Sequence, residues 1–108
     1  MRTVASLLLI ALVGFTMIQG CVGRIPLKDI PVTEDVSFET HIAPITRSIC
    51  ISCHSQGSRD FTQYRNAYVM RQTIYRRVVV ERTMPVGAYL SDQDRALFRD
   101  WVNQGGKK

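Results

Sequence analysis

Two cysteines and a histidine stand close together near the middle of the chain, in the order Cys50-Ile51-Ser52-Cys53-His54. Two thiols separated by two residues and followed directly by an imidazole form the pattern of covalent c-type haem attachment. The cysteine sulfurs can bond to the two vinyl groups of a porphyrin, and the adjacent histidine is then held under the metal, where its nitrogen ligates iron. The motif therefore predicts one covalent haem c, attached through Cys50 and Cys53, with His54 as the proximal axial ligand.

Two other chemistries use similar residues. A structural zinc site needs four nitrogen or sulfur ligands, and Cys50, Cys53, His54 and the distant His41 could supply four, although no second paired motif supports such a site. A thioredoxin-like redox pair also contains two cysteines at this spacing, but it is expected within alternating strands and helices. No pattern of alternating buried strands surrounds the motif, so the sequence favours haem.

The N-terminus has the form of an export signal. Arg2 is followed by an apolar run over residues 4–18, which at roughly 15 residues is shorter than the ~20 that a membrane-spanning helix needs. Ordinary signal cleavage prefers small residues at both −1 and −3, whereas Ile18 is bulky. Residues 18–21 (IQGC) instead resemble a bacterial lipobox, which implies that Cys21 receives a diacylglyceryl group and becomes the mature N-terminus. An uncleaved anchor is the alternative.

Charge and cysteine count limit the partners. The chain has three cysteines and a formal net charge of +5. With lipid on Cys21 and haem on Cys50 and Cys53, no thiol is left for a disulfide. Removal of residues 1–20 takes away only Arg2, which leaves 13 basic and nine acidic residues, a charge of +4. Such a surface can steer towards an acidic redox partner or lie against anionic lipid headgroups. The sequence contains no base-reading module, so nucleic-acid binding is not expected.

The chain divides into a lipoprotein signal peptide (1–20), a lipidated N-terminus with a flexible tether (21–37) and a folded domain (38–108). The tether is predicted because residues 22–37 contain two prolines, mixed charges and no sustained apolar period. The folded part is about 71 residues long, and a chain this short usually needs a staple, which a large apolar haem could provide.

Three helices are predicted, and the fold class is all-α. The first runs over 38–49, with a cap at Ser37 and a kink or restart at Pro44. The second covers roughly 65–81, and the third covers 92–103 with a cap at Ser91. The predicted buried positions are Phe38, Ile42, Ile45 and Ile49 in the first helix, Ala67, Met70, Ile74 and Val78 in the second, and Ala96, Leu97, Phe98, Trp101 and Val102 in the third. Gly105-Gly106 ends the last helix.

The order of motifs over 38–106 resembles that of small mono-haem class I cytochromes c. The matching features are Phe38-x3-Ile42-x-Pro44-Ile45, Cys50-x2-Cys53-His54, Tyr64, Met84-Pro85, Leu90-Ser91 and Leu97-x3-Trp101-Val102-x2-Gly105. The resemblance implies a small helical domain wrapped around one covalently attached haem, which in bacteria is attached outside the cytoplasm. It also implies that the distal ligand methionine stands at a Met-Pro step.

Met84 is the best candidate for the sixth iron ligand. Its thioether is a soft, neutral ligand, and Pro85 restricts the backbone beside it. Met70, His41 and an open site remain alternatives. The aromatic residues Phe38, Tyr64, Tyr89, Phe98 and Trp101 are expected in the core or the haem pocket. One of Arg65, Arg71, Arg76, Arg77 and Arg82 could pair with a haem propionate, but the sequence does not say which.

Together these features predict a one-electron carrier on a lipid-anchored protein of the bacterial cell envelope, with the haem domain on the extracytoplasmic side. Two occupied axial positions leave no place for a small-molecule substrate, and no nucleophile or acid–base pair is visible, so no enzyme activity is expected. The alternative function is a haem-based sensor or binder of gas ligands, in which the distal methionine is displaced.

Overall fold

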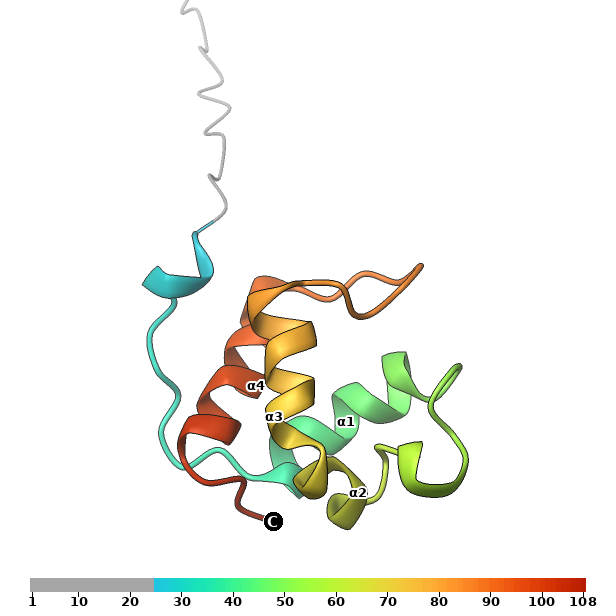
Figure 1. Cartoon of the computed structure of the whole chain (residues 1–108). Coiled ribbons are helices and arrows are strands. Elements are labelled where there is room, and N and C mark those ends of the chain that lie inside the picture. Colours follow the sequence, from blue (N-terminus) through green and yellow to red (C-terminus); the bar gives the residue numbers. More distant parts are fainter. Residues whose placement is uncertain (1–24) are drawn as a thin grey trace, which may run out of the picture.

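The computed structural model describes residues 25–108, and within this range it is helical with no strand (Figure 1). The predicted all-α class is therefore confirmed at the level of secondary structure. The elements in chain order are η1 (Leu27–Asp29), η2 (Phe38–Ile42), α1 (Ala43–Ile45), η3 (Thr46–Cys50), η4 (Gly57–Arg59), α2 (Tyr64–Val69), α3 (Arg71–Ile74), η5 (Tyr75–Val80) and α4 (Asp92–Asn103).

The first predicted helix is confirmed as a helical stretch formed by η2, α1 and η3. It begins after Ser37, whose hydroxyl accepts a hydrogen bond from the backbone N–H of Thr40 at 3.4 Å. The expected restart at the proline coincides with the start of α1, where Pro44 occupies the first turn. Phe38, Ile42 and Ile45 are buried as the spacing predicts, whereas Ile49 is half-buried.

The second predicted helix is confirmed as α2, α3 and η5, which follow one another from Tyr64 to Val80. Met70 lies at the junction of α2 and α3, with φ −92° and ψ 6°. Ala67, Ile74 and Val78 are buried and Met70 is half-buried. The apolar stripe thus faces the interior, while the arginines Arg76 and Arg77 are exposed.

The third predicted helix is α4, with the bounds expected from the sequence. The Ser91 hydroxyl accepts a hydrogen bond from the Asp94 N–H at 3.0 Å, which satisfies one of the unpaired donors of the first turn. At the other end Gly105 and Gly106 have φ values of +95° and +71°, a conformation that glycine adopts without strain. The Gly106 N–H donates to the Trp101 carbonyl at 2.9 Å and closes the helix.

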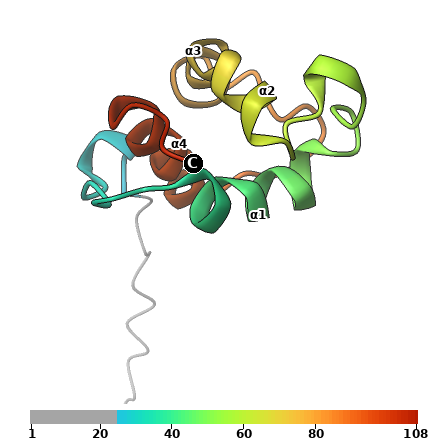
Figure 2. The same ribbon diagram turned by 90° about the horizontal axis from the view of Figure 1, so that it is seen from below.

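The centre of the core joins the first and last helices. The rings of Phe38 and Trp101 are both fully buried, with centroids 5.8 Å apart. The Trp101 indole N–H donates to the Lys107 carbonyl at 2.9 Å, and the Tyr64 hydroxyl donates to the Gly106 carbonyl at 2.9 Å. The N–H groups of Phe38 and Glu39 donate to the carbonyls of Lys107 and Lys108, at 2.9 and 3.2 Å, and hold the C-terminus against the start of the first helix. Figure 2 shows the chain end between α4 and this helix.

The flexible tether predicted over 21–37 is wrong for residues 25–37, which we call the N-terminal strap. The strap runs along α4 (Figure 1) and is held there by hydrogen bonds to its backbone. Arg99 donates to the carbonyls of Leu27 and Ile30 at 2.8 and 3.1 Å, and Asp100 accepts from the Thr33 N–H at 2.8 Å. The folded unit therefore begins before residue 38. Residues 21–24 of the predicted tether and the predicted signal peptide lie outside the described residues.

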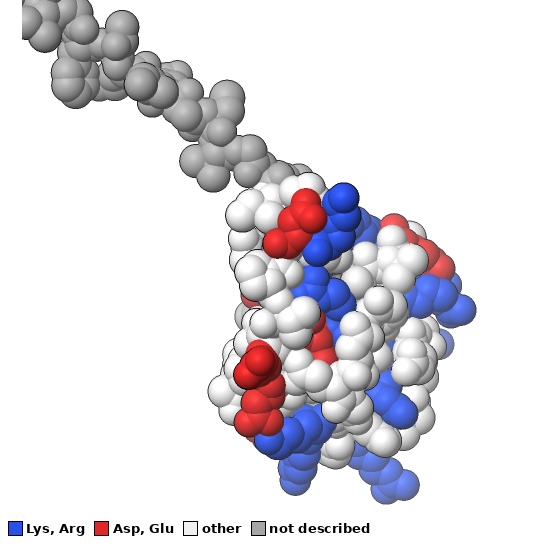
Figure 3. All heavy atoms as spheres, turned by 90° about the vertical axis from the view of Figure 1, so that its left-hand side faces the viewer, with Lys and Arg blue, Asp and Glu red and all other residues white. Residues whose placement is uncertain are grey.

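Two observations describe the outer surface. Figure 3 shows that the left-hand side of the view in Figure 1 carries both basic and acidic side chains rather than charge of one sign. Across residues 25–108 no helix combines the length and apolar character needed to cross a bilayer.

Candidate functional site: an apolar cavity at the Cys-x-x-Cys-His turn

A cavity of about 460 Å³ lies between the end of the first helix, the helices α3 and η5, and the loop 81–91. This volume is within the ~300–1,000 Å³ usual for sites that bind small molecules and cofactors. Most of the lining is apolar and comes from distant parts of the chain, including Ile49, Phe61, Ile74, Val78, Leu90 and Phe98. Such a lining suits a large, flat apolar group better than a hydrated ion.

The cavity brings together the four residues for which the sequence predicts haem contacts. Cys50, Cys53, His54 and Met84 all line it, although Met84 is far from the other three in the sequence. The chain turns sharply after η3, because the N–H groups of Cys53 and His54 both donate to the Cys50 carbonyl, at 3.2 and 2.9 Å. This turn places both thiols and the imidazole at one end of the cavity.

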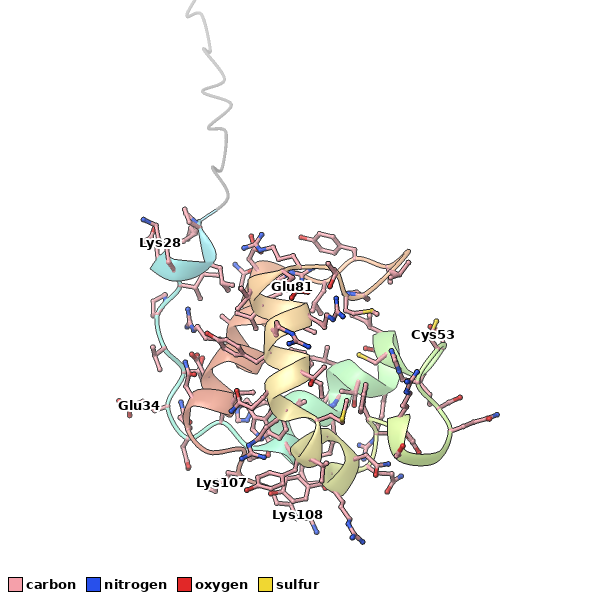
Figure 4. All side chains as sticks on the ribbon, in the orientation of Figure 1. Lys28, Glu34, Cys53, Glu81, Lys107 and Lys108 are labelled. Carbon is pink, nitrogen blue, oxygen red and sulfur yellow. The ribbon has the colours of Figure 1, made fainter. Side chains whose placement is uncertain are left out.

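The two thiols differ in their surroundings. Cys50 is half-buried and Cys53 is exposed on the turn (Figure 4), and neither forms a disulfide. Burial raises the pKa of the Cys50 thiol, so this group stays protonated at neutral pH. Thioredoxin-like cysteines have a lowered pKa, and the strands expected around such a pair are absent from residues 25–108. The geometry therefore gives the redox-pair alternative no support.

His54 carries an unmet polar group at the cavity. Its ring packs against Phe61, with centroids 4.9 Å apart, and its Nδ1 atom is buried without a hydrogen-bond partner among the described residues. A buried polar nitrogen without a partner costs free energy unless a ligand or solvent satisfies it. An imidazole that lines an apolar cavity and lacks a protein partner is suited to bind a ligand there.

Two of the three side chains considered as the sixth iron ligand lie at the cavity. Met84 and Met70 both line the cavity, whereas His41 does not. The His41 Nδ1 atom instead accepts a hydrogen bond from the Ser37 N–H at 3.1 Å, so this ring supports the start of the first helix. Within residues 25–108 no three side chains of His, Cys, Asp or Glu form a group that could hold a metal ion. The four ligands of the zinc alternative, with His41 as the fourth, are therefore not brought together among these residues.

The loop that carries Met84 is fixed at both sides of this residue. The Met84 N–H donates to the Arg77 carbonyl at 3.3 Å, and the Met84 carbonyl accepts from Nη1 of Arg95 at 3.0 Å. The neighbouring Thr83 N–H also donates to the Arg77 carbonyl, at 2.9 Å. Glu81, labelled in Figure 4, stands where the loop leaves η5. The Met84 backbone thus has a defined place beside the cavity.

Several residues of the site are not evident from the sequence. Phe61 and Arg59 line the cavity but belong to a turn-rich segment without periodicity. Of the arginines considered for a propionate, Arg77 lines the cavity, and its guanidinium bonds to Glu81 at 3.0 Å. Tyr89, expected among the packed aromatics, is instead 70% exposed.

Comparisons of the chain with protein-family models, with curated proteins and with solved structures return no match. The described residues form a helical domain that contains an apolar cavity. The thiols of Cys50 and Cys53 and the imidazole of His54 lie at one end of this cavity, and the thioethers of Met70 and Met84 also line it. These donors are those that covalent haem needs: thiols for the vinyl groups, and a nitrogen and a soft sulfur for iron.

Proposed function

We propose that this chain is a small mono-haem c-type cytochrome that carries single electrons on the extracytoplasmic side of a bacterial membrane. The observation that carries the proposal is that Cys50, Cys53, His54 and Met84 line a single apolar cavity. The spacing of the first three predicts attachment and proximal ligation. The position of Met84 adds a candidate distal ligand that is separated from the motif in sequence.

Each residue has a chemical role in this proposal. Cys50 and Cys53 hold the porphyrin edge through thioether bonds, which form when each thiol adds across a vinyl group without loss of atoms. His54 supplies a nitrogen and Met84 a sulfur to the iron. The haem would supply an iron that takes one electron from a reduced partner protein and passes it to an oxidised one. The apolar lining would limit contact of water with the ring, and methionine ligation would favour the ferrous state.

The partners follow from the same roles. With His54 and Met84 on the iron, no coordination position is left for a small-molecule substrate, so we propose a carrier rather than an enzyme. Its partners would be redox proteins, and the net positive charge of the chain favours acidic ones. We place the protein in the cell envelope through a lipid on Cys21.

The decisive experiment is a pyridine haemochrome spectrum of protein expressed with export and haem attachment. We expect the spectrum of a haem bound through two thioethers, and retention of haem on denaturing electrophoresis. The Cys50→Ser/Cys53→Ser double variant should lose both signals, while the matched Ser52→Ala variant should keep them. Parent protein without covalent haem would overturn the proposal. Ready binding of CO by the ferrous parent would favour the gas-ligand alternative.

The lipid anchor has a separate test. Cys21→Ser should leave the haem spectrum intact and abolish incorporation of labelled fatty acid, because the thioether to the lipid requires this sulfur. The protein should then leave the membrane fraction or persist as an uncleaved precursor. Labelled fatty acid in the Cys21→Ser variant would show that this site is wrong.

A further inference from the structure

Arg95 connects two parts of the cavity wall from outside. It lies in the first turn of α4, and its Nη1 atom donates to two main-chain carbonyls, that of Val78 in η5 and that of Met84 in the loop 81–91, the second at 3.0 Å. Val78 and Met84 both line the cavity, but Arg95 does not. One guanidinium nitrogen therefore ties the end of a helix to the residue proposed as the distal ligand.

The surroundings of Arg95 strengthen these bonds. Its side chain is partly buried, and burial, followed by the nearby positive charge of Arg82, lowers the pKa of the guanidinium. Asp92 and Tyr89 act in the opposite direction. Hydrogen bonds from a charged donor are stronger than neutral ones, and a partly buried guanidinium without these carbonyls would lose acceptors that water cannot fully replace. Breaking the two bonds from Arg95 to the carbonyls of Val78 and Met84, which together we call the clamp, therefore costs free energy.

The loop has few other restraints at this point. On its N-terminal side the Thr83 and Met84 N–H groups bond to the Arg77 carbonyl. Beyond Met84 the residues Val86 and Tyr89 are 74% and 70% exposed, so side-chain packing contributes little there. Leu90, 5% exposed, anchors the far end of the loop in the core. Between Met84 and Leu90, the bond from Arg95 to the Met84 carbonyl is the hydrogen bond that fixes the loop backbone among the described residues.

We infer that Arg95 is a positioning residue that holds the Met84 thioether at the cavity by clamping the Met84 carbonyl to the end of η5. The inference deepens the proposed function and rests on it for the role of the sulfur. A thioether is a weak, neutral ligand, so its bond to iron depends on how well the protein holds it in place. Loss of the clamp should release Met84 without affecting the attachment through Cys50 and Cys53.

The test is Arg95→Met, which removes the donors and keeps most of the aliphatic bulk. In the haem-loaded full chain we expect the haem to stay covalently bound, the long-wavelength ferric band of methionine ligation to be weakened or lost, and CO binding by the ferrous form to increase. Amide hydrogen exchange of Thr83 and Met84, whose N–H groups bond to the Arg77 carbonyl, should rise about tenfold or more, as expected for the loss of charge-assisted hydrogen bonds that hold the loop. Arg95→Lys, which retains a charged donor, should recover part of both signals.

The matched control is Arg99→Met, four residues further along α4. Arg99 also donates to main-chain carbonyls, but those belong to the strap. This variant should accelerate amide exchange in the strap and leave the exchange of Thr83 and Met84 and the ferric band as in the parent. The inference is overturned if Arg95→Met leaves the amide exchange of Thr83 and Met84 unchanged, or if Arg99→Met changes it equally. A parent that lacks the ferric band would instead contradict the proposed Met84 ligation, independently of the exchange result.

Discussion

The imidazole ring of His54 lies against the phenyl ring of Phe61, with ring centroids 4.9 Å apart and planes tilted by 31°. His54 belongs to the turn after the first helix, and Phe61 follows the short helix η4. The intervening segment therefore folds back so that an apolar ring covers one side of the imidazole. This contact limits the rotation of the imidazole and keeps its orientation towards the cavity.

Phe61→Ala should loosen the imidazole. We expect the free energy of unfolding of the haem-loaded protein to fall by about 2 kcal/mol, less than for a fully buried phenylalanine because Phe61 is half-buried. The His54 ring signals in NMR spectra of the reduced protein should broaden or shift. Phe61→Leu keeps an apolar side chain and should show a smaller effect on both. Identical NMR spectra for Phe61→Ala and the parent would contradict a role in orienting His54.

Met84→Ala should keep the covalent haem and change its chemistry. Loss of the soft thioether removes a ligand that favours the ferrous state, so the midpoint potential should fall, the long-wavelength ferric band should vanish and the ferrous form should bind CO. Redox titration and absorption spectra measure these changes.

Met70→Leu is the control for this pair, because Met70 also lines the cavity and the exchange nearly conserves volume. It should alter stability by less than about 1.5 kcal/mol and leave the band in place. If Met70→Leu abolished the band while Met84→Ala kept it, the distal ligand would be Met70.

Trp101→Ala should destabilise the domain without changing the cavity lining. The side chain is fully buried and packs against Phe38, so we expect a loss of about 3–5 kcal/mol in the free energy of unfolding, measured with denaturant. Trp101→Phe keeps an aromatic ring but loses the bond to the Lys107 carbonyl, and should cost less. A larger loss for Trp101→Phe than for Trp101→Ala would be inconsistent with packing as the main contribution.

Arg99→Met should release the strap. Asp100 is 1% exposed, and its Oδ1 atom lies 2.7 Å from Nε of Arg99, so removal of the guanidinium leaves a buried carboxylate without its cation. Breaking such a pair costs about 3 kcal/mol. Limited proteolysis should then cut within residues 25–37, while the parent resists. Equal cleavage of parent and variant would show that the strap does not depend on this contact.

The sequence predicts local features of this fold better than distant ones. The helix over 92–103 follows from its cap at Ser91, its apolar spacing and the glycines after it, all of which lie within the segment. The strap has no sustained apolar period, although Val36 is fully buried, and hydrogen bonds to its backbone hold it in place. Those contacts depend on Arg99, Asp100 and Gln104, more than sixty residues further along the chain.

The same distinction applies to the site. The spacing of Cys50, Cys53 and His54 can be recognised from the sequence alone. The structure adds that Met84 lines the same cavity as these three residues. Phe61 and Arg95 could not be assigned from the sequence. One lies in an aperiodic turn, and the other is a charged residue of an amphipathic helix, where the usual expectation is exposure to water.

The strap shortens the distance that could separate the folded domain from a bilayer if Cys21 carries a lipid. Cys21 and the first described residue, Ile25, are four positions apart in the sequence, and a fully extended chain over that interval spans at most about 14 Å. A sixteen-residue free linker would have reached on the order of 50 Å. With lipid on Cys21 and the strap packed on α4, the domain would stay close to the bilayer. It would then meet its partners by lateral diffusion within the membrane plane.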